Sequence, residues 1–282
     1  MWAILGGLVA AVSWAITSLT AARASRLIGS YSTLAWVMLT GFIVVAPVAL
    51  AQGKPEGLDR TSIGWLVIAG LSNVGGLLLI YTGFRMGGVG VVAPISSAEG
   101  AVAAVIAVAA GESLGAGVAL ALVAIVAGVV LVASAHAHVP DLDHVDPRAA
   151  LFGLASAGAF GTGLYATGRA SLDLPIAWAI LPPRLFGVAF IFLPLLVTRR
   201  LRLTRAALPF VVGSGLAEVT GFVSYAIGAR HGIAVTAVLA SQFAALAAIG
   251  AAILWGERLG RLGVIGIAVI AGGVAVVSAL SA

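Results

Sequence analysis

The sequence consists of long apolar stretches, each about as long as a helix that crosses a membrane, separated by short polar connectors. Such a helix needs about 20 apolar residues. Of the 282 residues, 61% are hydrophobic and only 9% are charged, and the mean hydropathy is +1.16. Soluble domains carry about 25% charged residues. The composition therefore predicts an all-α polytopic membrane protein.

Ten stretches are long and apolar enough to be transmembrane helices. They cover residues 1–22, 33–51, 62–85, 88–110, 115–134, 149–170, 174–197, 206–229, 232–255 and 261–281. The first one lacks the basic segment that opens a secretory signal, so we expect it to be the first span. The longest connector, "HAHVPDLDHVDP" (136–147), divides the chain into two halves of five helices.

The two halves repeat each other when the chain is shifted by 145 residues. The segment "GLSNVGGLLLIYTGFRMGG" (70–88) then lies on "GLAEVTGFVSYAIGARHGI" (215–233), and "GESL" (111–114) lies on "GERL" (256–259). Because five is odd, the second half must start on the opposite side of the membrane. The sequence therefore predicts two inverted five-helix repeats, residues 1–134 and 149–282, joined by a connector at 135–148. This architecture is typical of secondary transporters with a midplane site.

Three features together carry a family resemblance over nearly the whole chain. The five-plus-five arrangement, "SWAITSL" in the first span, and Gly-Glu-x-Leu at the ends of the fourth and ninth spans resemble the EamA type of the drug/metabolite transporter superfamily. The chain has Pro94 in the fourth span but Leu239 at the equivalent place in the ninth. It has Met38 and Leu39 where the family often has an arginine, and offers Arg184 in the seventh span instead. The resemblance implies a transporter, commonly an exporter, of small metabolites.

Polar side chains inside membrane-spanning helices tend to face the bundle interior or a hydrated cavity. Here they concentrate in the first, third, fourth, sixth, eighth and ninth spans, which are the spans that line the central cavity in the family the chain resembles. The aromatic members could wall this cavity or serve helix packing alone. The candidate substrate-binding residues are Trp14, Thr17, Asn73, Tyr81, Ser96, Ser97, Phe160, Tyr165, Tyr225, Ser241 and Gln242.

The fifth and tenth spans are almost purely apolar. Small residues four apart, Ala124 with Gly128 and Ala268 with Gly272, suit close contact between helices. We expect these two spans to pack at the periphery of the bundle.

Three ionisable residues, Glu99, Glu218 and Arg184, lie well inside the expected spans. A charge at the membrane centre costs about 2.5–3.5 kcal/mol and therefore needs a partner or water. Three explanations are open: Arg184 pairs with one glutamate, one glutamate carries a proton across, or a carboxylate binds an amine of the solute. Glu218, central in its span, is the first candidate for proton coupling.

Glu112 and Glu257 close the fourth and ninth spans. An acidic side chain at the C-terminus of a helix opposes the helix dipole. We therefore expect each carboxylate to accept backbone N–H groups at the start of the helix that follows it. This role would be structural, with gating as the alternative.

Other site classes receive little support. The connector holds His136, His138, Asp141, Asp143, His144 and Asp146. These are metal-ligand types, but connectors collect such residues by chance and we expect no metal site. The absence of cysteine excludes disulfide and thiolate chemistry. The net charge of +5 reflects loop arginines and predicts no nucleic-acid partner.

Two signals disagree about the orientation of the chain in the membrane. The positive-inside rule places the connectors richest in arginine in the cytoplasm and both termini outside, whereas the family resemblance implies cytoplasmic termini. The arginines concerned are Arg23, Arg26, Arg85, Arg148, Arg199, Arg200, Arg202, Arg205, Arg258 and Arg261.

The sequence as a whole predicts a secondary transporter of small solutes such as amino acids or amines. It would be a multi-pass protein of the plasma membrane (the bacterial inner membrane), needing no cofactor and working by alternating access, with proton coupling as one option. Its partners would be the solute and the lipid bilayer. The alternatives are an integral membrane enzyme acting on a lipid and a channel-like facilitator.

Overall fold

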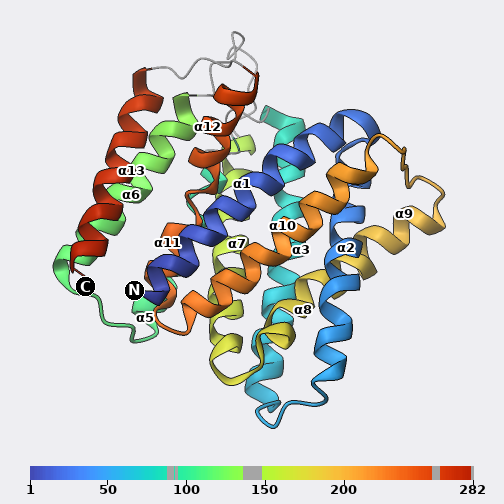
Figure 1. Ribbon diagram of the computed structural model, residues 1–282, viewed down its shortest axis with the longest axis horizontal. Coiled ribbons are helices and arrows are strands. Elements are labelled where there is room, and N and C mark those ends of the chain that lie inside the picture. The colour runs from blue at the N-terminus through green and yellow to red at the C-terminus, as the bar shows by residue number, and fades with distance from the viewer. Residues whose placement is uncertain (88–91, 93–94, 136–147, 256–260, 281–282) are drawn as a thin grey trace.

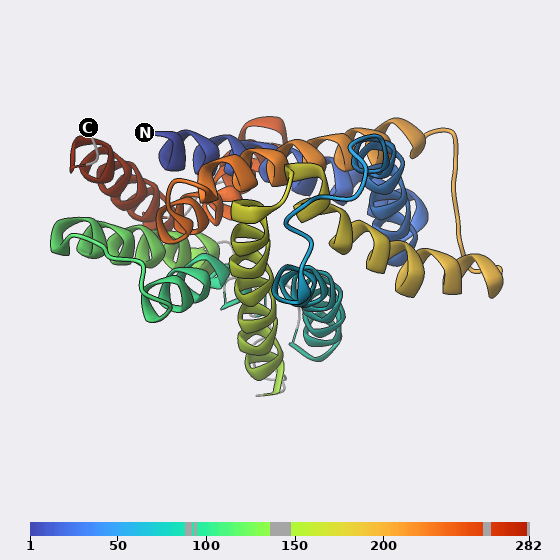
Figure 2. The same ribbon diagram turned by 90° about the horizontal axis from the view of Figure 1, so that it is seen from below.

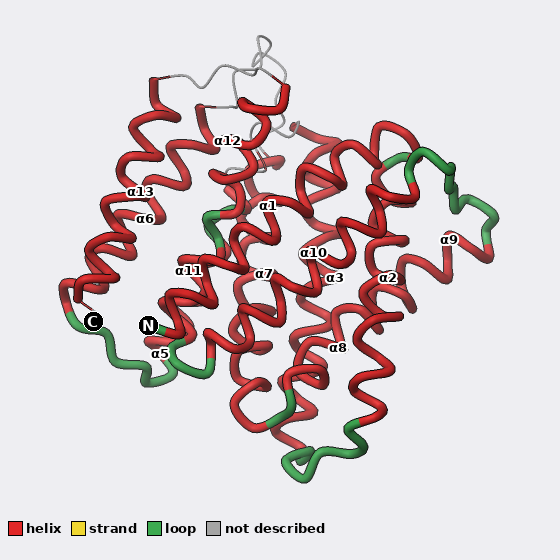
Figure 3. The backbone as a smooth tube through the Cα atoms, viewed as in Figure 1, coloured by secondary structure: helices red, strands yellow, loops and turns green. Residues whose placement is uncertain are grey.

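The computed structural model describes residues 1–87, 92, 95–135, 148–255 and 261–280. Figure 3 shows that this part of the chain is built from helices and loops without any strand. The helices of the first half are α1 (Trp2–Ile28), α2 (Ser30–Ala51), α3 (Arg60–Gly87), α5 (Glu99–Ala109) and α6 (Ala116–Ala135). Those of the second half are α7 (Arg148–Asp173), α8 (Ile176–Gly187), η2 (Val188–Phe192), α9 (Leu193–Val197), α10 (Leu208–Ala229), α11 (Ile233–Ala240), α12 (Phe243–Trp255) and α13 (Arg261–Leu280).

Six helices within the described residues are long and apolar enough to cross a membrane: α1, α2, α3, α7, α10 and the continuous segment Ile176–Val197. Four shorter apolar helices accompany them, at Glu99–Ala109, Ala116–Leu131, Ile233–Ala247 and Arg261–Val277. The protein is therefore an all-α polytopic membrane protein, as the composition predicted. The connector residues 136–147 and Glu257 lie outside the described residues, so their predicted roles stay predictions.

The fourth and ninth expected spans are interrupted at equivalent places. A turn at Ser97 and Ala98 precedes α5, and a turn at Ser241 and Gln242 separates α11 from α12. The Ser241 hydroxyl donates a hydrogen bond of 2.9 Å to the carbonyl of Val238. Such local bonds compete with the helical ladder. The sequence-based expectation of continuous helices was wrong here, because no change in hydropathy marks the two turns.

The seventh span is also irregular. Pro182 and Pro183 lie inside α8, and a π-helical turn, η2, follows at Val188–Phe192. Proline has no N–H to donate, so each proline inside a helix removes one backbone hydrogen bond. The sequence "LPPR" accounts for the irregular backbone around Arg184.

The start of α3 is fixed by a reciprocal cap between Asp59 and Ser62. The Ser62 N–H donates to Asp59 Oδ1 at 2.7 Å, and the Asp59 N–H donates to the Ser62 hydroxyl at 2.9 Å. These two residues therefore satisfy two donors at the helix start. The hydrogen bonds from Ser62 hold the pKa of Asp59 below its usual range.

Close helix pairs join the first half of the chain to the second. α1 packs along α10, α3 along α7, and α5 against α11, while α6 and α13 form a pair at one edge of the molecule (Figures 1 and 2). In the α6–α13 pair, Gly128 lies against the carbonyl of Gly266, and Gly273 against Ala121. Gly272 has open space around it, so the expected small-residue contact is displaced by one position.

The α1–α10 pair is close because glycines meet at its crossing. A Cβ added to Gly6 would lie 2.6 Å from the Cα of Gly228 and 2.6 Å from the carbonyl oxygen of Ser224. Both neighbours are backbone atoms, which cannot rotate away. Small residues at such crossings allow the van der Waals contact that holds membrane helices together.

We expect Gly6→Ala to lower the free energy of unfolding by about 1–3 kcal/mol, because the added methyl group forces α1 and α10 apart. Gly213→Ala is the matched control, since nothing lies within 4 Å of a Cβ at this position in α10. The control should be neutral or stabilising by up to about 1 kcal/mol. Unfolding of detergent-solubilised protein by sodium dodecyl sulfate measures both values, and equal effects of the two substitutions would contradict the close crossing.

Candidate functional site

A cavity of about 370 Å³ lies between the two halves of the bundle. Its walls come from α1, α2, α3, the Ser96–Ser97 segment, α5, α7, α8, α10 and α12. Sites for small molecules usually have volumes of about 300–1,000 Å³. The cavity is therefore large enough for a small organic molecule.

The cavity extends from the middle of the bundle toward one of its faces. On α1 its lining runs from Trp14 to Ser25, in the second half of the helix, and on α2 from Thr33 to Met38, in the first half. Both stretches approach Gly29, where α1 ends and α2 begins. We call this side the Gly29 face, and the opposite side, where α10 ends and α11 begins, the Gly232 face.

At the Gly232 face, Glu112 joins the two halves. Its carboxylate accepts hydrogen bonds of 3.1 Å from the N–H groups of Ile233 and Ala234, at the start of α11. Gly232, with φ of 147°, adopts a conformation that favours glycine and brings these donors to the carboxylate. The expectation that Glu112 binds the helix following it was wrong. The carboxylate does accept N-terminal N–H groups, but α5 ends beside α11 of the other half.

Further hydrogen bonds join α10 and α11 to neighbouring helices on this side. Arg230 donates to the carbonyls of Ser171 (2.6 Å) and Leu174 (2.8 Å) at the end of α7. The Thr236 hydroxyl donates to the carbonyl of Ala3 at 3.2 Å. These bonds cross between the halves or tie α10 to α7, and the Gly232 face is tightly packed as a result.

Six of the predicted substrate-binding residues line the cavity: Trp14, Thr17, Asn73, Ser96, Ser97 and Phe160. The glutamates Glu99 and Glu218 line it as well. The structure therefore brings together residues from α1, α3, α5, α7 and α10 that are far apart in the sequence.

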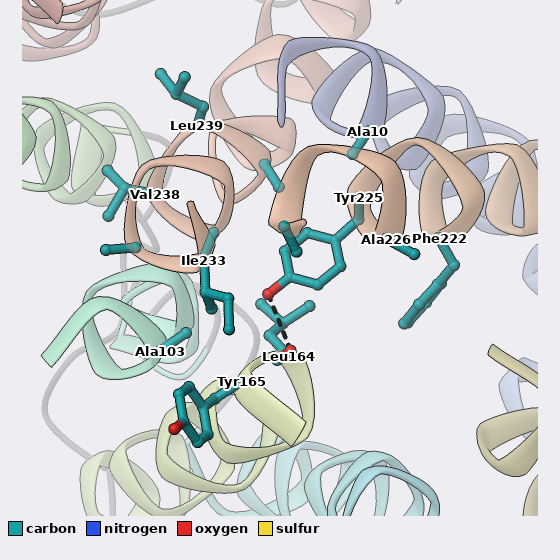
Figure 4. Close-up of a cluster of buried hydrophobic side chains, with 14 of the residues drawn as sticks. Ala10, Ala103, Leu164, Tyr165, Phe222, Tyr225, Ala226, Ile233, Val238 and Leu239 are labelled. Atoms are coloured by element: carbon teal, nitrogen blue, oxygen red, sulfur yellow. Dashed lines mark hydrogen bonds between the residues drawn. The ribbon is translucent and has the colours of Figure 1, made fainter. Parts of the chain in front are cut away.

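Four other predicted residues, whose side chains the structure describes, are not part of the cavity lining. Tyr165 packs edge-on against Trp65, with 5.6 Å between ring centroids. The Tyr225 hydroxyl donates to the carbonyl of Leu164 at 2.9 Å, inside the apolar core drawn in Figure 4. Ser241 and Gln242 form the turn between α11 and α12. The side chain of Tyr81 lies outside the described residues.

Sequence reasoning missed part of the wall. Phe222 and Phe243 line the cavity, as does Pro183 of α8. Four α2 residues also line it: Thr33, Leu34, Val37 and Met38. Phe222 could have been found, because it follows Glu218 by four residues and so lies on the same helical face. The α2 residues gave no signal, since this stretch is as apolar as a lipid-facing helix.

Arg184 and Glu218 form an ion pair beside the cavity. Arg184 Nη2 lies 3.4 Å from Glu218 Oε1, and the two side chains are 1% and 14% exposed. The Phe222 ring lies against the guanidinium, with 4.1 Å from its centroid to Arg184 Cζ. Gly41 of α2 allows this close packing, because a Cβ there would lie 3.0 Å from Arg184 Cγ. Arg184 itself is absent from the described cavity lining.

Glu99, the first residue of α5, reaches the cavity from a tightly packed position. Its side chain is only 8% exposed. Within the described part of the chain, its carboxylate has no hydrogen-bond or ion-pair partner. A Cβ at Gly161 of α7 would lie 2.6 Å from the Glu99 carbonyl oxygen, so the backbones of α5 and α7 nearly touch at this point. The two buried glutamates thus differ in their surroundings.

Aromatic rings form much of the remaining wall. The Trp14 ring lies 5.0 Å from that of Phe222 and 6.1 Å from that of Phe243, both in edge-on geometry. Phe160 adds a fourth ring from α7. The site therefore combines an apolar, aromatic surface with two carboxylates, of which one is paired.

We expect Glu218→Gln to lower the free energy of unfolding by about 3–5 kcal/mol, because it leaves the buried Arg184 charge uncompensated. The double variant Arg184→Met, Glu218→Gln removes both charges and should cost less than the sum of the single changes. Titration of the four proteins with sodium dodecyl sulfate measures the coupling. If the effects of the two single substitutions on the free energy of unfolding add up to that of the double variant, the ion pair contributes nothing to stability.

Comparison with known proteins finds a family match for the first half of the chain and a similar fold for nearly all of it. Residues 1–134 match the EamA-like transporter family. No curated protein matches the sequence. A solved crystal structure has the same fold, with a TM-score of 0.78 over 99% of this chain and 96% of that one, at 18% sequence identity. Over residues 1–134 the chain is thus similar to the EamA-like transporter family, a family of membrane transporters.

Proposed function

We propose that the protein is a secondary transporter that moves small organic solutes, such as amino acids or amines, across the plasma membrane by alternating access. One observation carries the proposal: the cavity between the halves extends toward the Gly29 face, while hydrogen bonds between helices pack the Gly232 face. A transporter stopped in one of its two states should have this asymmetry. Export and a bacterial inner-membrane location are part of the proposal.

The pairing of the helices supports two inverted repeats at residues 1–134 and 149–282. When the first half of the chain is laid on the second with an offset of 145–146 residues, α1 coincides with α7 and α3 with α10. The α1–α10 pair then becomes the α7–α3 pair, which is also present, and the α6–α13 pair becomes itself. A two-fold exchange of the halves explains this pattern, and inverted repeats commonly enclose a midplane substrate site.

In this mechanism the contacts at the Gly232 face must break when the cavity opens to that side. Among the contacts described above, the Glu112 carboxylate with its two backbone donors is the one that joins the two halves through a charged group, and hydrogen bonds to a charged group contribute about 1.5–3 kcal/mol. Besides capping α11, Glu112 would therefore act as a latch, that is, a contact that keeps the Gly232 face closed. Its removal should favour opening of the Gly232 face.

Cysteine labelling can measure this opening, since the chain has no cysteine of its own. We expect Glu112→Ala to raise the labelling rate of a cysteine at Ala229, which is 1% exposed at the end of α10, about tenfold, corresponding to about 1.4 kcal/mol. A water-soluble maleimide is the probe.

Two controls separate a latch from general loosening. A cysteine at the buried Ala35, near the Gly29 face, should label no faster when Glu112 is replaced. Glu56→Ala, at an exposed position between α2 and α3, should leave both rates unchanged. Equal increases in the labelling rates at Ala229 and Ala35 would contradict the proposal that Glu112 holds the Gly232 face closed.

Coupling to protons would rest on one of the two cavity glutamates. Glu218 is engaged by Arg184 at 3.4 Å, whereas Glu99 has no such partner among the described residues. A carboxyl group without a fixed counter-charge can gain and lose a proton without leaving an arginine unpaired. Glu99 is therefore the better candidate for the coupling residue, in place of Glu218, which the sequence favoured.

Transport by purified protein in proteoliposomes tests the proposed function. We expect saturable uptake of at least one member of a labelled set of amino acids, amines and sugars, with stimulation by an imposed pH gradient. Glu99→Gln should remove the stimulation, and Glu56→Gln should not. Flux that rises linearly with concentration would indicate a channel, and conversion of the lipid without any gradient would indicate an enzyme.

A further inference from the structure

We propose that the cavity selects organic monocations, with a protonated amine attached to an apolar or aromatic body, and that Glu99 is the counter-ion of the amine. This inference rests on the proposed function, because it names the substrate class of the same cavity.

The charge balance of the cavity is the first argument. Among the described lining residues, only Glu99 and Glu218 are ionisable. Arg184 pairs with Glu218, so among these two groups Glu99 is left without a charged partner within the described residues. An ionised group in an apolar, buried site is costly unless it is paired. A single positive charge on the solute would supply the missing pair.

Shielding of the arginine is the second argument. The Phe222 ring contacts the Arg184 guanidinium at 4.1 Å and also forms part of the cavity wall. Arg184 is 1% exposed and does not belong to the described lining. Its positive charge is therefore committed to Glu218 and covered by an aromatic ring. A solute carboxylate would find no free cation on this wall.

The composition of the wall is the third argument. Trp14, Phe160, Phe222 and Phe243 surround the space with aromatic rings. Ring faces attract organic cations, and the effect grows when the partners are desolvated. The same surfaces accommodate an apolar body. The wall thus complements both parts of an arylalkylamine.

The position of Glu99 is fixed by packing. A Cβ at Gly161 would lie 2.6 Å from the Glu99 carbonyl oxygen, and one at Gly100 would lie 2.5 Å from Ser241 Oγ and 2.6 Å from the carbonyl oxygen of Ala237. α5 is therefore held between α7 and α11 where Glu99 reaches the cavity. A preorganised charge binds its partner without paying the entropy of being ordered.

Three probes with the same phenyl ring and two-carbon chain isolate the charge: 2-phenylethylamine, 2-phenylethanol and 3-phenylpropionate. We expect calorimetry at pH 7.5 on the full-length protein in detergent to show the amine binding at least about tenfold more tightly than the alcohol. The carboxylate should bind more weakly than both. Equal affinities, tighter binding of the carboxylate, or no binding of any probe would overturn the proposed substrate class.

Variants assign the selectivity to Glu99. In the Glu99→Gln variant, the affinity for the amine should fall to within about twofold of the affinity for the alcohol. The affinity for the alcohol itself should hardly change. Glu99→Asp, which keeps the charge, should retain part of the preference, and Glu56→Gln should retain all of it. An unchanged preference for the amine in Glu99→Gln would show that Glu99 is not its counter-ion. If this variant fails to fold, the wild-type probe series and Glu99→Asp still decide the outcome.

Transport distinguishes failure of this inference from failure of the proposed function. Saturable uptake of neutral or anionic solutes alone would retain the transporter and overturn the cation selectivity. Tight amine binding without saturable uptake of any solute would retain the cation site and overturn the transporter.

Discussion

An ionised side chain inside a membrane protein must find an opposite charge or water, and this requirement organises the centre of the bundle. Arg184 and Glu218 meet at 3.4 Å beneath the Phe222 ring, and Gly41 leaves the space in which they pack. Glu99 has no such partner among the described residues and borders a cavity instead. The ion pair thus leaves one carboxylate available to the interior space. The functional proposals depend on this division of roles.

The second organising feature is the difference between the two faces. At the Gly232 face, helix ends are satisfied by side chains from neighbouring helices, as Glu112 does for α11 and Arg230 for α7. Unsatisfied N–H and C=O groups at helix ends are natural partners for such side chains. The same bonds close this side of the bundle. In the proposed mechanism, the contacts that cap these helix ends are also the ones that must break when this face opens.

The sequence predicted some elements and site residues correctly and missed others. The run lengths and the low charge predicted the long apolar helices, and the repeat placed Asn73 and Glu218 at equivalent depths, where both line the cavity. The turns at Ser97 and Ser241 were missed because apolar residues continue through them. Tyr165 and Tyr225 were placed with the cavity residues, yet both are buried in helix packing. Polarity alone cannot tell a cavity-facing hydroxyl from one bonded to a nearby carbonyl.

The sequence by itself determined that the chain is a membrane bundle, because apolar stretches about 20 residues long have few other stable states. It also determined the internal repeat and which polar residues lie within the spans. Only the tertiary structure decided which glutamate pairs with Arg184, which helix start Glu112 caps, and that α2 contributes to the cavity wall. These outcomes depend on the rotation and crossing of helices that are distant in sequence. Close contacts between glycines and backbone atoms set those crossings.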